Sequence, residues 1–590
     1  MTEGRRVRVD PRLVSGIIGA GFLVCAALPA LAAALAVVGS DWVPSSDHAT
    51  EILRILDVGG GNSPVVGSWS RLGWSHPGPA LFWALAPFER LGGDTGVLVG
   101  TGVLNALSAT AIAVVAWRRG GLAFAAPTVG VVAALASGAG ASTLVDPWNP
   151  IVAFLPFVLS VFLVWTALCG DAFLLPWSAV AGSFAVQCHV GYAPVVGGLI
   201  AVACLVVVLQ GIRRRSAGVA PAQVKVGRRA AASGGLVLLL LLWLPPVGQQ
   251  LTQPDGNLAA LVEYSSSPPE DPAGLGQAVG IWGAQMRVAG PWVTGDNASG
   301  EYDPTAPWPE AAALTVLVAA AAFYERRRLP AVATAGIVTL LATALSVLAT
   351  SRITGFPAPY LMRWWAAVPA MAMLTLVWSV SSRNQILRVG TIVISGISAC
   401  ALSFSAVANG ARVPLPVVSD ALARVAEPVS EELRLDERYL VRAISVMTLN
   451  APATGLLLAL ERRGFDVTMD ATDLNASAVG EWRTSEVRDV DAILYAADLR
   501  DLEAGWAPPT GSTLLAEWDP LTPRQRRRLR QLQTEIRDRL ALDRDTLVDI
   551  RAERVLAEAS RAGMSAAHLD ELRELGEFAD GLAVFRAPPA

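Results

Sequence analysis

The stretch LVSGIIGAGFLVCAALPALAAALAVV, residues 13–38, decides the fold. It holds no charged residue, and as a helix it is long enough to cross the apolar core of a bilayer, which takes about 20 residues. The basic residues Arg5, Arg6, Arg8 and Arg12 precede it. A cleaved signal peptide has an apolar core of only about 7–15 residues, so we interpret this run as a retained first membrane span.

Further apolar runs of similar length follow. Of the 590 residues, 53% are hydrophobic and 16% are charged, whereas a soluble protein carries about a quarter charged residues. The fold class that this predicts is a polytopic α-helical membrane protein with about eleven spans. After 13–38 we expect spans near 96–116, 122–140, 150–168, 172–188, 193–210, 231–247, 308–324, 329–350, 360–381 and 387–408.

Basic residues predict the orientation, because cytoplasmic loops carry the excess of arginine and lysine. With a cytoplasmic N-terminus and eleven spans, every strong basic cluster between spans falls inside. This count requires residues 79–92, which are too short to cross, to form a helix lying at the membrane surface. The clusters are Arg118–Arg119, Arg213–Arg215 with Lys225 and Arg228–Arg229, Arg326–Arg328, and Arg383 with Arg388.

Residues 409–590 differ in composition from the rest, since they are dense in Arg, Asp and Glu. Residues 439–446, 465–470 and 491–497 are typical of strands, and residues 454–464 are typical of a helix that ends at a glycine. We therefore predict a transmembrane domain at 1–408 and an extracytoplasmic α/β domain at 409–590.

Charge and cysteine usage exclude some classes of function. The formal net charge of −4 gives no indication of a nucleic-acid partner. All five cysteines lie in apolar segments and none forms a CxxC pair, so zinc and disulfide sites are not indicated. Lys225 is the only lysine, and with much Ala, Val and Gly this suggests a GC-rich, actinobacterial genome. The predicted location is a bacterial inner (plasma) membrane.

The first outer loop carries the most informative motifs. It begins SDWVPSSDHATEILRILDV (40–58), continues to HPGPALFWALAPFERLGG (76–93), and the next span ends in WRRGG (117–121). This order resembles the C-type (GT-C) glycosyltransferases, which include protein mannosyltransferases, aminoarabinose transferases and actinobacterial arabinosyltransferases. In that family an acidic pair follows the first span. A helix at the membrane surface comes next, introduced by prolines, and the second span then ends in basic residues. Here Asp47-His48 takes the acidic position, with histidine in place of a second acid.

The resemblance implies a transferase of the inverting type, which moves a sugar from a polyprenyl-phosphate donor to a cell-envelope glycan, lipid or protein outside the cytoplasm. Asp47 would then be the catalytic base that accepts the proton of the acceptor hydroxyl. The structural alternative is that Asp47, like Ser45 and Ser46, caps a helix.

Other polar residues on the outer side are candidates for binding. His76, Arg352 and Arg363 are predicted to bind the donor phosphate, with Arg363 preferred because it lies within a span; headgroup contact is the alternative for both arginines. Substrate or metal contact is predicted for His48, Glu51, Asp146, Asn149 and His189. A divalent cation, Mg²⁺ or Mn²⁺, is left open, and no other cofactor is expected.

Two other classes of function remain open. A transporter of envelope lipids or glycans would show inverted repeats and charged residues near mid-span, and neither is visible. A non-catalytic membrane scaffold would tolerate the Asp-His pair. A lipid-sized groove that converges on Asp47 would favour the enzyme over the scaffold.

Overall fold

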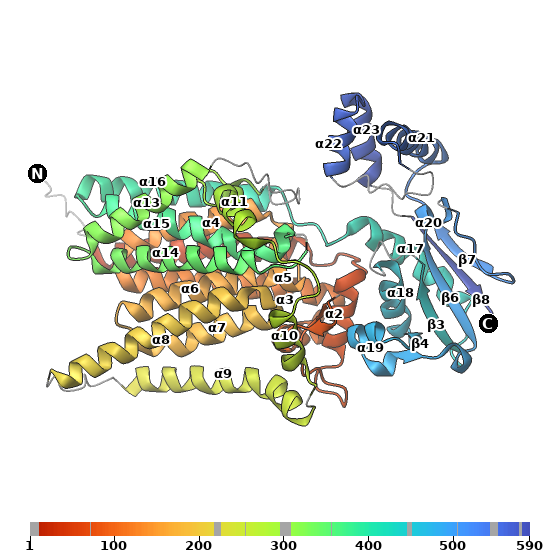
Figure 1. Ribbon diagram of the computed structural model, residues 1–590, viewed down its shortest axis with the longest axis horizontal. Coiled ribbons are helices and arrows are strands. Elements are labelled where there is room, and N and C mark those ends of the chain that lie inside the picture. The colour runs from red at the N-terminus through yellow and green to blue at the C-terminus, as the bar shows by residue number, and fades with distance from the viewer. Residues whose placement is uncertain are drawn as a thin grey trace, which may run out of the picture.

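The computed structural model is a bundle of long helices with an α/β unit at one end (Figure 1). The structure describes residues 11–70, 72–217, 226–253, 255–295, 308–355, 357–444, 451–503, 505–542, 553–577 and 581–589. The predicted fold class, a polytopic helical membrane protein with a C-terminal α/β region, is confirmed.

A helix lies at the position of each predicted span. Nine helical segments of the described chain are long and apolar enough to cross a membrane; α7 and α13 are outside that set and remain predicted spans. The helices are α1 (Pro11–Ala36), α3 (Ala80–Gly120), α4 (Leu122–Ala139), α5 (Asn149–Val152), α6 (Phe154–Leu168), α7 (Leu175–Cys188), α8 (Ala193–Ser216), α9 (Val226–Thr252), α13 (Trp308–Glu325), α14 (Pro330–Ser351), α15 (Ala367–Ser381) and α16 (Gln385–Ala408).

Helix α3 is two helices joined at Gly93. This glycine has φ 60° and ψ −146°, a conformation that a side chain would strain. The break separates residues 80–92 from the span that follows. A distinct helix therefore exists where the sequence predicts one, and its position at the membrane surface stays a prediction.

Short elements occupy the connections between the long helices. In Figure 1, α2 and α10 lie between the bundle and the α/β unit. These elements are α2 (Ser46–Leu56), β1 (Trp69–Ser70), β2 (Trp74–Ser75), η1 (Ser142–Leu144), η2 (Ala172–Leu174), η3 (Val190–Tyr192), α10 (Asn257–Ser266), α11 (Gly274–Gln285), α12 (Pro291–Thr294) and η5 (Pro359–Ala366).

The C-terminal unit is built on a six-stranded sheet with strand order β5-β4-β3-β6-β8-β7. β5, β4, β3 and β6 are parallel, and β8 and β7 extend the sheet in antiparallel pairing. The strands are β3 (Arg438–Ala443), β4 (Asp466–Asp470), β5 (Thr484–Ser485), β6 (Ala492–Asp498), β7 (Thr513–Trp518) and β8 (Leu582–Ala587). β3 and β6 are apolar along most of their length, as parallel strands covered on both faces are.

Helices complete this unit. They are α17 (Pro416–Glu431), α18 (Ala451–Glu461), α19 (Asp473–Val479), η6 (Glu481–Arg483), η7 (Val487–Asp489), α20 (Leu499–Glu503), α21 (Pro523–Leu540), α22 (Glu553–Arg561) and α23 (Ala566–Glu577). The last three pack around a small core of their own. Since α16 ends at Ala408 and α17 begins at Pro416, the architecture changes where the composition changes. The division into domains 1–408 and 409–590 stays a prediction.

The two units meet through α2. Its apolar residues Ala49, Ile52 and Leu53 are fully buried, and α18 packs against it. At Gly455 of α18 a side chain would come within 2.7 Å of the carbonyl oxygen of Pro44, so only glycine allows this close approach. Helix α2 is thus held between the bundle and the C-terminal unit.

Ion pairs close the same interface. Arg483 donates to Asp57, the C-cap of α2, at 3.0 Å and to Glu461 of α18 at 2.7 Å. Arg462 reaches Glu89 at 3.1 Å and also pairs with Asp94, on either side of the break in α3. Paired and largely buried charges of this kind fix orientation, because moving the units apart would leave each charge without its partner.

Candidate active site

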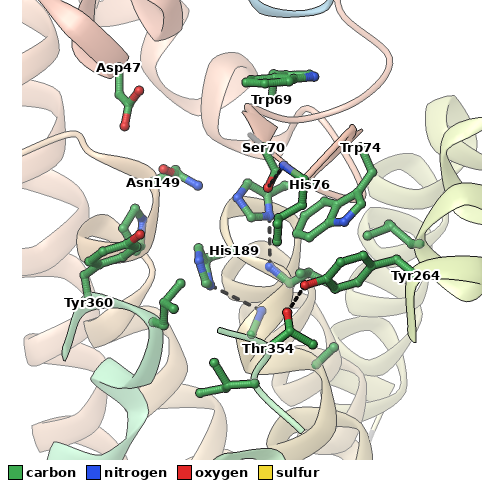
Figure 2. A pocket seen from close by; sticks show the side chains of 18 of the residues that line it. Asp47, Trp69, Ser70, Trp74, His76, Asn149, His189, Tyr264, Thr354 and Tyr360 are labelled. Atoms are coloured by element: carbon green, nitrogen blue, oxygen red, sulfur yellow. Dashed lines mark hydrogen bonds between the residues drawn. The ribbon is translucent and has the colours of Figure 1, made fainter. Parts of the chain in front are cut away.

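A cavity of about 640 Å³ lies where the bundle meets the C-terminal unit. Its wall combines the first loop, the starts of α5 and α8, α10, the end of α14, η5, and residues of α18, β4 and α19. The cavity therefore joins segments that are hundreds of residues apart in the sequence. Figure 2 shows Asp47 and Trp69 toward one end of it and Tyr264 and Thr354 toward the other.

The basic clusters lie at the far ends of the spans that border this cavity. α8 begins at the cavity wall with Ala193 and ends in Arg213–Arg215. α14 follows Arg326–Arg328 and reaches the wall with Ala349. The cavity is thus on the side of the bundle opposite these arginines, which accords with an extracytoplasmic site, while the orientation in a membrane stays a prediction.

Asp47 lies in the first turn of α2, where a helix N-terminus favours negative charge. Its side chain is exposed and lines the cavity. Its Oδ2 accepts a hydrogen bond from the indole nitrogen of Trp148 at 2.9 Å. The N-cap position belongs to Ser45, which makes no side-chain capping bond. Asp47 is therefore an oriented carboxylate in the cavity and makes no capping hydrogen bond.

The loop 146–149 holds the polar face of α2. Asp146 Oδ1 lies 2.8 Å from His48 Nε2 and accepts from the backbone N–H of Trp148 at 2.9 Å. His48 and Asp146 are not among the residues that line the cavity, and substrate or metal contact stays a prediction for both. They fix the turn that presents Trp148 to Asp47.

Glu51 lies beneath this arrangement and is 2% exposed. Its Oε1 accepts from the backbone N–H of Asn149 at 3.1 Å and from Ser68 Oγ at 3.2 Å, while Oε2 has no partner among the described residues. Burial, and then the charge of Asp47, raise the pKa of Glu51 well above its usual 4.5. Glu51 is not among the residues that line the cavity, and its substrate contact stays a prediction.

Asn149 lines the cavity, as its predicted role requires. Its amide nitrogen donates to the carbonyl of Cys188 at 2.8 Å, which ties the start of α5 to the end of α7. The next residue, His189, also lines the cavity. Sequence positions 149 and 189 are thus brought together, and a role in substrate contact stays a prediction for both.

His76 and His189 form a pair whose ring centroids are 4.7 Å apart. His76 Nδ1 accepts from the backbone N–H of Val190 at 3.1 Å, and His189 Nδ1 accepts from that of Gly191 at 3.2 Å (Figure 2). Burial lowers the pKa of His76 well below 6.5 and that of His189 to about 4. Both rings are therefore neutral with the proton on Nε2, which leaves each Nε2–H as a hydrogen-bond donor.

The two candidate arginines differ in position. Arg352 follows α14, lines the cavity, and donates one bond to the carbonyl of Ser265 at 3.2 Å. Arg363 borders a separate pocket of about 20 Å³ with Asn105 and Thr143. Within the irregular turn η5 the adjacent Trp364 lines the large cavity and Arg363 lines the separate pocket, so the geometry favours Arg352, and donor binding by either arginine stays a prediction.

Aromatic side chains line much of the cavity, and the sequence did not single them out. Trp74 lies 5.5 Å from Tyr264 and Trp148 lies 5.0 Å from Tyr360, between ring centroids. The remaining aromatic wall residues are Trp69 and Trp364. A tryptophan on each strand of a short hairpin around Gly73 was a signal that could have identified Trp69 and Trp74.

Asn257 of α10 fixes this hairpin. Its side chain accepts from the backbone N–H of Ser75 at 2.7 Å and donates to the carbonyl of Ser75 at 2.8 Å. Trp74 is held between this contact and Tyr264. The segment after α9 thus supports the cavity wall.

A divalent cation does not fit these residues well. Among the described residues there is no group of three or more His, Cys, Asp or Glu side chains that could hold a metal ion.

Comparison with known proteins places the fold. No family model and no curated protein matches this chain. The crystal structure of ArnT from Cupriavidus metallidurans bound to undecaprenyl phosphate aligns with a TM-score of 0.52 at 13% identity, covering 86% of this chain and 97% of ArnT. Its apo form covers the same shares at 13% identity with a TM-score of 0.37, too low to carry an argument. ArnT is an aminoarabinose transferase of the GT-C type, so the resemblance in fold to GT-C proteins is shown.

Proposed function

We propose that this protein is a membrane glycosyltransferase of the GT-C type, which moves a sugar from a polyprenyl-phosphate donor to a hydroxyl group of a cell-envelope acceptor. The observation that carries the proposal is the position of Asp47. Its carboxylate is exposed in a cavity that also contains Arg352 and the Nε2–H donors of His76 and His189. A base, a cation and neutral donors within one cavity are what transfer from a phosphate leaving group requires.

The proposed step is a single displacement. The acceptor hydroxyl oxygen attacks the anomeric carbon of the donor, and the bond from that carbon to the phosphate oxygen breaks. Asp47 takes the hydroxyl proton, and polyprenyl phosphate leaves with the electron pair. Attack from the face opposite the phosphate inverts the anomeric centre. Trp148 supports the step because its indole N–H fixes Asp47 at one oxygen and leaves the other available.

Arg352 is the proposed partner of the donor phosphate. Its guanidinium uses one described bond, to Ser265, so further N–H groups are available for phosphate oxygens. His76 and His189 would add neutral donors. A lipid-linked donor also accords with the fold, since the ArnT structure of the same fold contains undecaprenyl phosphate. A polyprenyl tail would remain in the bilayer while its phosphate enters at the outer ends of the spans.

The proposed location is the plasma membrane of a bacterium, with the C-terminal domain outside the cytoplasm. The clusters Arg213–Arg215 and Arg326–Arg328 support this orientation, because each lies at the end of a span away from the cavity. The acceptor would then be a component of the cell envelope that reaches the cavity from the outer face.

Transfer by purified protein tests the proposal. The full chain in nanodiscs is incubated with a panel of polyprenyl-phosphate sugars and an envelope extract, and release of free polyprenyl phosphate is measured together with labelled product. We expect one donor to be consumed in a protein-dependent manner. If every donor stays intact while a fluorescent polyprenyl phosphate still binds, the chain is not a transferase and a lipid-binding role replaces it.

A further inference from the structure

The described residues of the cavity wall carry few charges. Among the described residues that line it, Arg352 is the one arginine or lysine and Asp47 is the one carboxylate. His76 and His189 are neutral because burial lowers the pKa of both. If the proposed function holds, the donor phosphate binds to Arg352. The described wall then offers no second cationic side chain that could bind an anionic acceptor.

The end of the cavity near Asp47 is formed by the C-terminal unit. Thr454 of α18 donates a hydrogen bond to the carbonyl of Ser46 at 3.3 Å, immediately before Asp47. Met469 of β4 and Leu474, Asn475, Ala478 and Val479 of α19 form the facing wall. All of these residues are uncharged, so among the described residues at this end Asp47 is the one that carries a charge, and it would repel an anionic acceptor.

Neutral polar groups and an aromatic ring occur together at this end. Asn475 uses its amide nitrogen to hold the carbonyl of Asp470 at 2.9 Å, and its side-chain oxygen has no protein partner among the described residues. Ser46 and Thr50 contribute hydroxyl groups to the wall, and Trp69 contributes an indole ring. An aromatic face beside amide and hydroxyl groups suits a sugar ring, whose C–H face is apolar and whose edge carries hydroxyls.

We propose that the acceptor is an uncharged, hydroxyl-bearing glycan, which binds between Trp69 and helix α19 of the C-terminal unit. This inference rests on the proposed function, because it takes the Arg352 end for the donor. Asp47 lies at the α19 end, within reach of a hydroxyl presented there. The C-terminal unit would thereby select the acceptor as well as cover the site.

Binding to a glycan array tests this separately from transfer. The full chain in nanodiscs is applied to neutral oligosaccharides and to counterparts of the same backbone that carry carboxylate, sulfate or phosphate groups. Serine-containing peptides are included as alternative acceptors. We expect neutral glycans to bind at least tenfold better than their anionic counterparts. Stronger binding of the anionic glycans, or binding of peptides alone, would overturn the proposal.

A charge introduced on α19 gives a test that misfolding cannot imitate. Ala478→Arg places a cation in the wall of the proposed acceptor end and should shift preference toward anionic glycans by at least tenfold. Ser477→Arg adds the same charge at an exposed position of α19 outside the wall and should leave the preference unchanged. If the two variants behave alike, the acceptor does not bind against α19. Donor consumption by wild type, measured in parallel, decides the proposed function independently of this result.

Discussion

Replacement of Arg483 by methionine should loosen the contact that positions α2. Arg483 is 7% exposed at its side chain and donates to Asp57 at 3.0 Å, to both oxygens of Glu461 at 2.7 and 2.8 Å, and to the carbonyl of Val479 at 2.9 Å. Methionine retains most of the volume and removes every one of these bonds. The perturbation therefore isolates the charge at the junction of the two units.

The expected loss follows from the charges left behind. Asp57 is also 7% exposed at its side chain and would keep Arg54, at 3.0 Å, as its remaining partner. Removing one member of a buried ion pair typically costs about 3–5 kcal/mol. For a unit of 150–250 residues each kcal/mol lowers the melting temperature by roughly 2–4 °C, so a fall of roughly 6–20 °C is expected.

The pH dependence of this loss gives a second readout. Burial raises the pKa of Asp57, and Arg483 opposes that rise. Without Arg483 the pKa rises further, so the variant gains a proton more readily in acid and loses its uncompensated charge. The deficit in melting temperature should therefore be smaller at pH 5 than at pH 8.

Tryptophan fluorescence of protein in nanodiscs, followed on heating, measures this prediction. The matched control is Arg488→Met, since Arg488 is 84% exposed at its side chain and its nearest carboxylate is Asp489 at 4.0 Å. The control should change stability by no more than about 0.5 kcal/mol. Equal melting temperatures for Arg483→Met and wild type at both pH values would refute the view that this ion pair holds α2 in place.

Two further predictions concern the cavity. Arg352→Gln should weaken binding of a fluorescent polyprenyl phosphate roughly 10- to 150-fold, because a hydrogen bond to a charged group is worth about 1.5–3 kcal/mol. Arg363→Gln is the control and should leave the binding unchanged. Equal losses of affinity in the two variants would remove Arg352 from the donor site. The melting temperature of Glu51→Gln should exceed that of wild type by an amount that grows as the pH rises from about 5 to 8. The reason is that the raised pKa of Glu51 makes the wild type lose folding stability as the pH rises, whereas glutamine does not titrate. A difference in melting temperature that stays constant with pH would show that Glu51 is charged in the fold.

Much of the fold was predictable because membrane spans leave a strong local signal. An apolar run such as 13–38 has few alternatives in a bilayer, and the strands at 439–446 and 491–497 were recognised by their apolar, β-branched composition. Even the separate helix at 79–92 followed from its length. The physical reason is that span length and strand composition are properties of short, contiguous segments.

The candidate site was less predictable because it depends on contacts distant in sequence. Asp47 was selected from the family resemblance, and its exposure in a cavity accords with that choice. The sequence could not show that Asp146 would bond to His48, nor that Arg352 rather than Arg363 would face the cavity. Such choices depend on where an irregular turn directs a side chain, and local periodicity carries no such information.

The residues that the C-terminal unit contributes to the cavity could not be identified for the same reason. Asn475 and Ala478 lie more than 400 positions after Asp47, on a short helix that the sequence did not indicate. Their place in the cavity wall follows from the docking of α18 on α2, in which Gly455 permits the close approach. No pattern within residues 409–590 specifies that contact.

The central claim is that Asp47 is the base of a sugar transfer, and the rate of transfer by Asp47→Asn tests it most directly. A positioned base contributes about 10²–10⁴-fold, so transfer from the preferred polyprenyl-phosphate sugar should fall at least about 100-fold. The melting temperature should remain near wild type, because asparagine retains the size of the side chain and can still accept from Trp148. Asp41→Asn, at an exposed acid of the same loop outside the cavity wall, should retain wild-type transfer. Full transfer by Asp47→Asn would contradict the account.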